Sequence, residues 1–302
     1  MARTGPGTLV RHSGRLLESG DMAVERLRSG DRSGPYDLVL DSDMAAALAT
    51  ATLDHTPSYF DGTALPPTAI ATQTYAPQMA AIFELVPESV FGAAHGGVHG
   101  RHDLVLHRAI RPGEELHSLV EMHSARRSKD NLRVTLLHRT YDALDRLVAE
   151  QWWTTVLLGT SADEIGPELP AHGGNGCDPE QAIGEEVIRI DADMVRRYAE
   201  LSGDFSDHHF DVEAARRSGF AGPFLHGLCT MALCARAVVA TVCPDDPSRL
   251  QRLAVQFASP AYLQQDLTVR TCSLGEDRVA FEATNANSVV IRNGFAELRR
   301  PG

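Results

Sequence analysis

Residues 228–242 of the chain read LCTMALCARAVVATV and contain one charged side chain, Arg236. A helix that is apolar on nearly all of its faces has to be buried. Four segments that favour strands follow it, at 250–257, 267–273, 278–284 and 288–299. Leu253, Val255 and Phe257 alternate along the first of them, which indicates a strand with one covered face. We therefore expect an α+β unit in which an antiparallel sheet wraps around the buried helix.

The N-terminal half repeats this order of elements more faintly. A candidate central helix covers residues 70–83, and the strands that we expect after it lie at 103–109, 116–123, 132–141 and 147–158. Gly, Asn, Pro and acidic residues are frequent between the two halves, which is typical of a linker. We predict a mobile arm over 1–35, a first α+β unit over 36–160, a linker over 161–184 and a second unit over 185–302.

Composition excludes several classes of function. The 302 residues suit two domains of about 130–150 residues each. A formal net charge of −12 argues against a nucleic-acid partner, because binding phosphates requires clustered Lys and Arg. No stretch approaches the 18 continuous apolar residues of a membrane span. The five cysteines show no C-x-x-C spacing and suggest neither a disulfide framework nor a zinc site, so we expect a cytoplasmic location.

The chemistry is concentrated in two neighbouring stretches. Residues 198–211 read YAELSGDFSDHHFD, and residues 219–230 read GFAGPFLHGLCT. Ser202-Gly203-Asp204 ends one predicted helix, and His209 precedes the next, so a carboxylate and an imidazole lie on one short loop. A histidine titrates near neutral pH and burial can tune a carboxylate, so Asp204 and His209 can divide acid and base roles around a shared water.

Gly227 lies where the buried helix begins. The first turn of a helix has unpaired N–H groups and the positive end of the helix dipole. A thioester carbonyl placed there would be polarised, and an enolate would be stabilised. Glycine also allows the backbone to approach a substrate closely. Asp204, His209 and Gly227 together predict addition of water to an α,β-unsaturated thioester, or its removal.

These stretches resemble the signature of the R-specific enoyl-CoA hydratases and MaoC-like dehydratases. The family pattern is aromatic-x-x-x-S-G-D-x-N-P-x-H-x-D followed by G-F-x-x-P-x-x-H-G-L. The positions that match it are Tyr198, Ser202, Gly203, Asp204, His209, Asp211, Gly219, Phe220, Pro223, His226, Gly227 and Leu228. The resemblance covers about 187–299 well and the N-terminal half only in its order of elements.

The resemblance implies a double hotdog, with two curved antiparallel sheets that each wrap around a long central helix. It also implies an N-terminal hotdog that has lost the catalytic residues and holds the acyl chain. The expected reaction is reversible hydration of trans-2-enoyl thioesters to R-3-hydroxyacyl thioesters. No bound cofactor is expected, because coenzyme A or phosphopantetheine arrives with the substrate. The candidate partners are that acyl thioester, an acyl carrier protein and a second copy of the chain.

Two residues depart from the family pattern. Ser206 stands where the family has Asn, and Asp207 stands where it has Pro. The family's Asn helps to hold the catalytic water, so Ser206 either positions the water itself or leaves that role to a neighbour. Asp207 and His208 add two titratable groups beside the catalytic pair. We expect these changes to affect rate and substrate preference more than the type of reaction.

Other candidate binding residues have simpler interpretations. For His226 we favour a structural role, with its ring bonded to neighbouring backbone, over direct catalysis. His95, His99, His102 and His107 lack the spacing of zinc motifs, so no metal site is predicted, and His99 is a candidate for lining the pocket. Arg216, Arg217, Arg249 and Arg252 either meet the phosphates of coenzyme A or are solvated surface charges.

Two other functions compete with hydration. A hotdog thioesterase would direct water from the same pocket at the carbonyl carbon, although the frame around Asp204 and His226-Gly227-Leu228 argues against it. A catalytically weak acyl-binding subunit of a biosynthetic assembly is suggested by Ser206 and Asp207. Turnover of crotonyl-CoA would separate that subunit from an enzyme.

Overall fold

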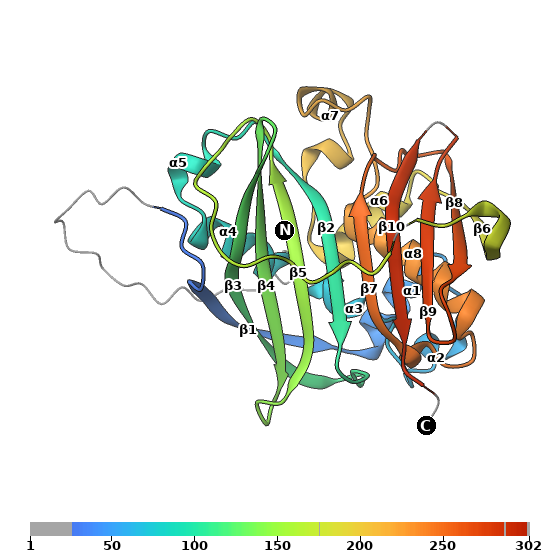
Figure 1. Cartoon of the computed structure of the whole chain (residues 1–302). Helices are drawn as coiled ribbons and strands as arrows, with labels where there is room; N and C mark the ends of the chain where they lie inside the picture. The colour runs from blue at the N-terminus through green and yellow to red at the C-terminus, as the bar shows by residue number, and fades with distance from the viewer. Residues whose placement is uncertain (1–25, 175, 287, 301–302) are drawn as a thin grey trace, which may run out of the picture.

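A single ten-stranded sheet organises the molecule (Figure 1). The computed structural model describes residues 26–174, 176–286 and 288–300. The strands follow the order β1-β3-β4-β5-β2-β7-β10-β9-β8-β6, so the first five strands of the sequence form one half of the sheet and the last five form the other. Every neighbouring pair in this order is antiparallel.

The N-terminal half contains five strands and five helices. Its central helix was predicted as one segment over 70–83, but it is interrupted at Thr74, which ends α3 and precedes α4. The elements in chain order are β1 (Arg32–Leu40), α1 (Ser42–Ala51), α2 (Pro57–Phe60), α3 (Ala69–Gln73), α4 (Tyr75–Leu85), α5 (Glu88–Phe91), β2 (Gly97–Leu106), β3 (Glu114–Ser128), β4 (Asn131–Asp142) and β5 (Leu147–Leu157).

The C-terminal half agrees closely with the predicted elements. The buried helix α8 covers Gly227–Val242, and eleven of its residues are buried in the core. The other elements are η1 (Pro179–Gln181), β6 (Ala182–Arg189), α6 (Met194–Ser202), η2 (Asp207–His209), α7 (Val212–Arg217), η3 (Pro247–Arg249), β7 (Leu250–Phe257), β8 (Asp266–Ser273), β9 (Arg278–Thr284) and β10 (Val289–Leu298). The predicted α+β architecture is confirmed.

The two halves join through β2 and β7, which pair from Arg101 opposite Gln256 to Val105 opposite Arg252. This pairing makes the two expected sheets continuous. Side chains of the same two strands form a second junction. Arg252 donates to both carboxylate oxygens of Asp103, at 2.9 and 2.7 Å, and Asp103 is fully buried. The halves are therefore held together by backbone pairing and by a buried ion pair.

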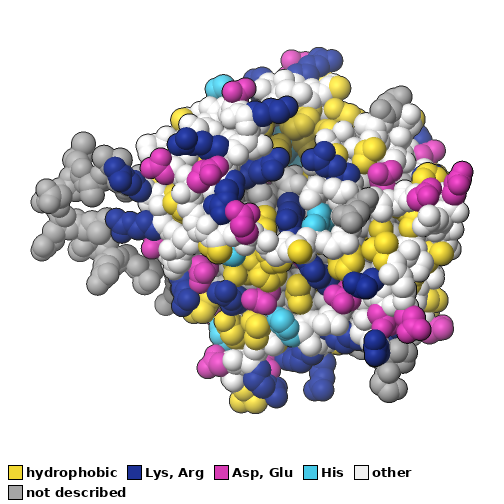
Figure 2. All heavy atoms as spheres, viewed as in Figure 1, with side chains coloured by type: hydrophobic (Ala, Val, Ile, Leu, Met, Phe, Trp, Pro, Cys, Tyr) yellow, Lys and Arg dark blue, Asp and Glu magenta, His cyan; other side chains and the backbone are white. Residues whose placement is uncertain are grey.

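The segment after β5 crosses the outer face of the sheet, where the yellow-green trace runs in front of the strands in Figure 1. It forms a bridge from Ile165 to Ala125 and accepts hydrogen bonds from Arg101 and Arg252 at Pro170 and Ala171. This outer face is mixed, with arginine and acidic side chains beside hydrophobic ones (Figure 2). The helices cover the opposite face of the sheet.

The structure corrects two expectations. Cys177 in the predicted linker forms a disulfide with Cys272 on β8, although no disulfide was expected. The pairing depends on the linker crossing the sheet, which spacing along the sequence does not reveal. The predicted mobile arm over 1–35 also extends too far, because residues 32–35 belong to β1 and Leu27 is buried. Residues 1–25 of that arm lie outside the described part of the chain.

The core consists of two hydrophobic clusters. The larger one gathers α8, α6 and α1 against strands from both halves of the sheet, and the smaller one joins α4 to β3 and β4 in the N-terminal half. Within the described residues, none of the helices combines the length and the hydropathy that a membrane span requires.

Candidate active site

Asp204 is held in place by the end of α6. Gly203 follows this helix with φ of +79°, a left-handed conformation that glycine adopts without strain. The chain turns there and places Asp204 at the entrance of a cavity. The Oδ1 atom of Asp204 accepts two hydrogen bonds, from the backbone N–H of Ser206 at 3.2 Å and from the Ser206 hydroxyl at 2.6 Å. The second oxygen, Oδ2, remains available to the cavity.

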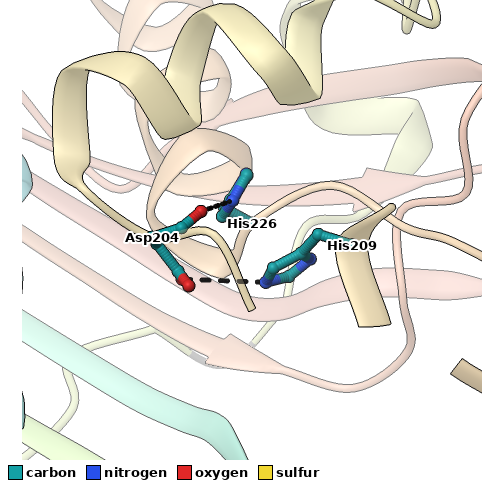
Figure 3. Close-up of side chains that lie close together, drawn as sticks. All are labelled: Asp204, His209 and His226. Carbon is teal, nitrogen blue, oxygen red and sulfur yellow. Dashed lines mark hydrogen bonds and ion pairs between the residues drawn. The ribbon is translucent and has the colours of Figure 1, made fainter. Parts of the chain in front are cut away.

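His209 faces that second oxygen. Its Nδ1 atom donates to the backbone carbonyl of Phe224 at 2.8 Å, and a carbonyl can only accept, so Nδ1 carries the proton. The Nε2 atom is 3.7 Å from Oδ2 of Asp204 (Figure 3). This separation exceeds a direct hydrogen bond and places both atoms within reach of one water molecule.

His226 contacts both members of this pair. Its Nε2 atom donates to the backbone carbonyl of Asp204 at 2.9 Å (Figure 3), which is the backbone bond that the sequence predicted. Its ring contacts that of His209 at a centroid distance of 4.0 Å, with the two planes tilted by 35°. Its Nδ1 atom is buried without a hydrogen-bond partner among the described residues. His226 therefore holds the backbone of Asp204 in place, and with it the Asp204 carboxylate.

The charges of the site follow from burial and from these contacts. Burial alone would raise the pKa of Asp204, but the contacts with His209 and Ser206 outweigh it and hold the pKa well below its usual range. Burial, with the neighbouring charge of His209, lowers the pKa of His226 to about 4 and that of His208 also to about 4. At neutral pH the site therefore combines an ionised carboxylate with neutral imidazoles at 208 and 226.

Gly227 begins α8 and packs against the N-terminal half. An added Cβ at Gly227 would lie 3.1 Å from both Cβ and Nδ1 of His99, so only glycine fits without displacing that ring. His99 in turn stacks on Trp153 and contacts Phe257, at centroid distances of 4.7 and 4.5 Å. The first turn of α8 thus meets an aromatic wall, and the first N–H groups of a helix have no partner within the helix.

A cavity of about 400 Å³ connects these residues, and both halves line it. Asp204, Ser206, His209, His226 and Gly227 line it from the C-terminal half. The main contributors from the N-terminal half are Tyr75, Gln78, Met79, Ile82, Phe91, His99, Trp153 and Thr155. The structure therefore brings the predicted catalytic residues together, and it places His99 on the cavity wall as expected.

Tyr75 was missed by the sequence analysis. It is the first residue of α4, and its hydroxyl interacts with the side chains of Ser206 and Asp204 across the cavity. Burial and the charge of Asp204 raise the pKa of Tyr75, so the phenol keeps its proton and acts as a donor. No motif marks this residue, because its role depends on how the two halves pack.

The two residues beside the family's Asn-Pro position have different surroundings. Asp207 is exposed and does not line the cavity. His208 does line it and stacks on Phe224, with 5.2 Å between ring centroids. Of these two, only His208 is placed to influence the reaction.

The arginine candidates lie outside the cavity. Arg252 is held by the buried Asp103, and Arg249 donates to the backbone carbonyl of Arg299, so both have structural partners, which favours a structural role over phosphate binding. Arg216 pairs with the exposed Glu213 on α7, where Arg217 also lies. Only this pair on α7 remains a candidate for coenzyme A phosphates.

One group among the described residues could present ligand atoms to a metal ion, and it is the catalytic cluster itself. The nearest such atoms of Asp204, His209 and His226 all lie within 4.8 Å of one another. The rings of His209 and His226 are tilted by 35° relative to each other, with 4.0 Å between their centroids. Backbone carbonyls already occupy one nitrogen of each ring. These bonds leave Nε2 of His209 and Nδ1 of His226 without a carbonyl partner. The absence of a metal site stays a prediction.

Comparison with known proteins agrees with this geometry. Residues 177–293 match the family described as MaoC like domain. Peroxisomal multifunctional enzyme type 2 of Mus musculus is 37% identical over 100 residues, which cover 32% of this chain and 14% of that protein. Probable enoyl-CoA hydratase 2 of Dictyostelium discoideum is 31% identical over 117 residues, covering 38% of this chain and 39% of that protein.

A longer alignment links the chain to 3-hydroxyacyl-thioester dehydratase Y of Mycobacterium tuberculosis, at 28% identity over 213 residues, which cover 66% of this chain and 72% of that protein. The match to the mouse and Dictyostelium proteins spans well under two thirds of their length.

Solved structures extend the similarity to the whole fold. A MaoC-like dehydratase from Phytophthora capsici has a TM-score of 0.75 and 20% identity, and the alignment covers 92% of this chain and 98% of that one. A Mycobacterium tuberculosis protein described as a double hotdog has a TM-score of 0.62 and 15% identity, covering 90% and 96%. The predicted double hotdog is confirmed.

Proposed function

Since residues 177–293 match the MaoC-like domain and the fold is a double hotdog, we propose that the protein reversibly hydrates trans-2-enoyl thioesters to R-3-hydroxyacyl thioesters. One observation carries the proposal. Asp204 Oδ2 and His209 Nε2 lie 3.7 Å apart, and both residues line the same cavity as Gly227 in the first turn of α8. Hydration needs both features, a group that handles the protons of water and an electrophilic site for the thioester oxygen.

The reaction follows from the positions of these groups. The thioester carbonyl lies against the N–H groups at Gly227, which stabilise the negative charge that develops on its oxygen. Asp204 and His209 hold the water and take a proton from it as its oxygen bonds to C3. The electrons of the C2–C3 double bond move into the enolate and then form the new C2–H bond with a proton from the pair. One water thus supplies the hydroxyl at C3 and the hydrogen at C2.

Tyr75 completes the proposed water site from the N-terminal half. Ser206 directs its hydroxyl at Asp204 Oδ1, so its proton is engaged by the carboxylate. The Tyr75 phenol lies beside both groups and keeps its proton at neutral pH. A hydrogen bond from this phenol would orient the attacking water or the carboxylate that activates it.

The position of the substrate, the partners and the cellular location are further parts of this proposal. We infer an acyl chain in the N-terminal part of the cavity and a coenzyme A or phosphopantetheine carrier at its mouth, where Arg216 and Arg217 on α7 are candidate phosphate ligands. An acyl carrier protein and a second copy of the chain stay as candidate partners. A cytoplasmic location also stays a prediction, and the Cys177–Cys272 disulfide is a bond more common in oxidising compartments.

A panel of trans-2-enoyl-CoA thioesters of increasing length tests the proposal. We expect loss of enoyl absorbance with no release of free coenzyme A. Release of free thiol would instead indicate a thioesterase. Binding without either reaction would indicate the acyl-binding subunit.

A further inference from the structure

The cavity runs along one face of α4. Tyr75, Gln78, Met79 and Ile82 line it at spacings of three, four and seven residues, which place them on one side of a helix. Tyr75 packs against the larger hydrophobic cluster beside the catalytic residues, whereas Ile82 belongs to the smaller cluster of the N-terminal half. The helix therefore leads away from the reacting atoms, and Gln78 lies one turn deeper than Tyr75.

A band of polar side chains crosses this cavity at the level of Gln78. His99 on β2 and Thr155 on β5 are direct partners in the ladder, so their side chains share one face of the sheet. Gln78 lies opposite them and is 1% exposed. Beyond the band the lining is apolar again, with Met79, Ile82, Phe91 and Leu157. We call Gln78, His99 and Thr155 the polar band.

Buried polar residues support the band from behind. His138 Nε2 bonds to the Gln78 side-chain carbonyl at 2.7 Å, and His102 bonds to His99 at 3.2 Å. The other ring nitrogen of His102 bonds to Gln151 at 3.1 Å. His102, His138 and Gln151 are all fully buried. Burial of three polar side chains costs free energy, and a pocket that binds only methylene groups would not need such side chains behind its wall.

Two groups of the band have unused hydrogen-bonding capacity. The Gln78 amide nitrogen has one partner among the described residues, the Thr155 hydroxyl at 3.5 Å, which is at the limit of a hydrogen bond. The Thr155 hydroxyl has no acceptor in the same part of the chain. An alkyl chain lying across the band would remove water from these groups without replacing its hydrogen bonds. An oxygen atom at that level would form hydrogen bonds with them.

We propose that the polar band recognises a hydroxyl group on the acyl chain, so that the preferred substrates are mid-length enoyl thioesters hydroxylated beyond the reacting carbons. This inference rests on the proposed function, because it requires the acyl chain to lie along α4. The Gln78 amide donates a hydrogen bond to the hydroxyl oxygen. The hydroxyl group in turn donates a hydrogen bond to Thr155 or to an imidazole nitrogen of His99.

The position of the hydroxyl follows from the helix. Gln78 lies three residues after Tyr75, or about 4.5 Å along the axis. An extended chain advances by roughly 1.2 Å per bond, so the band meets the acyl chain about four carbons beyond C3. The matched substrates are therefore 7-hydroxy-trans-2-octenoyl-CoA and trans-2-octenoyl-CoA.

The experiment measures the ratio of kcat/KM for these two substrates in each protein, so that losses of folded enzyme cancel. The wild type should favour the hydroxylated substrate by about tenfold, the value of one hydrogen bond to an otherwise unpaired group. Thr155→Val and Gln78→Met, which keep side-chain size and remove polarity, should each bring the ratio close to one. Thr140→Val makes the same change at a buried threonine outside the cavity and should keep the wild-type ratio.

A wild-type preference for the unmodified chain would overturn the inference, and so would a ratio that neither variant changes. The band would then serve only to support the fold. Isothermal titration with saturated 7-hydroxyoctanoyl-CoA and octanoyl-CoA separates this outcome from failure of the proposed function. If the protein hydrates no enoyl thioester and yet binds the hydroxylated ligand about tenfold more tightly, the proposed reaction is wrong and the recognition of the hydroxyl is right.

Discussion

The two oxygens of the Asp204 carboxylate have different surroundings. Oδ1 accepts hydrogen bonds from both the N–H and the O–H of Ser206, and Oδ2 lies 3.7 Å from Nε2 of His209. Serine at this position therefore bonds to the carboxylate, whereas the Asn of the family pattern is expected to hold the water. Serine leaves the positioning of the water to a neighbour that lines the cavity, and Tyr75 and His208 do so.

Removing the Tyr75 hydroxyl tests which neighbour has this role. Tyr75→Phe should lower kcat for crotonyl-CoA by about tenfold and change KM little, because one hydrogen bond is lost where the water reacts. Steady-state kinetics gives both parameters. Tyr141→Phe is the matched control, since its ring stacks on His117 on a strand outside the cavity. An unchanged kcat in Tyr75→Phe would assign the water to His208 instead.

Residues within one contiguous motif could be predicted, and residues brought in by packing could not. Asp204, His209 and Gly227 lie within 24 residues of one another, and helix ends and turns determine their relative positions. Tyr75 and Gln78 reach the same cavity from the other half. The sequence around them has the pattern of an ordinary amphipathic helix. The Cys177–Cys272 pair depends in the same way on the path of the linker.

At the scale of the element, α8 provides both the core of the C-terminal half and the electrophilic end of the site. Its interior could be predicted because it lacks charge almost throughout. The central helix of the N-terminal half was harder to predict, because the chain breaks at Thr74 between α3 and α4. That break directs Tyr75 toward Asp204. The strand β1 and the helix α1 were also missed, since neither carries a clear apolar period.

The close fit between α8 and the N-terminal half predicts the effect of a single methyl group. In Gly227→Ala the new Cβ lies 3.1 Å from His99, and stacking on Trp153 prevents that ring from moving away. The first turn of α8 must shift, and a displacement of about 1 Å costs on the order of 10²-fold in rate. Hydration of crotonyl-CoA should fall by that order, while thermal unfolding stays near the wild-type temperature.

Gly222→Ala is the control for this substitution, because its added Cβ meets nothing within 4 Å. Its activity should equal that of the wild type. Wild-type activity in Gly227→Ala would mean that the thioester oxygen does not bind at the first turn of α8.

At the scale of the whole molecule, one continuous sheet makes the site a product of both halves. The pairing of β2 with β7 and the buried Asp103–Arg252 ion pair hold the N-terminal half against the C-terminal half. The general order of elements predicted two related units. It did not predict that the units share one sheet.

Buried histidines should make the folded protein sensitive to acid. Burial lowers the pKa of His102 to about 4, of His138 to about 3 and of His226 to about 4. The unfolded chain titrates these groups near 6.5, so between pH 6.5 and about 4 it binds protons that the folded chain does not. The free energy of unfolding should therefore fall as the pH decreases through this window, by at most about 3 kcal/mol for each histidine.

Urea unfolding at pH 7, 5.5 and 4.5 measures this loss. His138→Asn should reduce the pH dependence, whereas His107→Gln, on a histidine with 38% of its side chain exposed, should leave it unchanged. Stability that is constant from pH 7 to 4.5 would show that these histidines are not buried in neutral form.

We propose that Asp204 in the C-terminal hotdog drives R-specific hydration, and one assay measures both the rate and the product. Crotonyl-CoA is incubated with the wild type, with Asp204→Asn and with Asp207→Asn, whose carboxylate is exposed outside the cavity. Loss of enoyl absorbance is followed, and the 3-hydroxybutyryl product is resolved by chiral chromatography. We predict R product from the wild type and from Asp207→Asn, and a rate about 10²–10⁴-fold lower in a folded Asp204→Asn. S product, or a wild-type rate in Asp204→Asn, would contradict the claim.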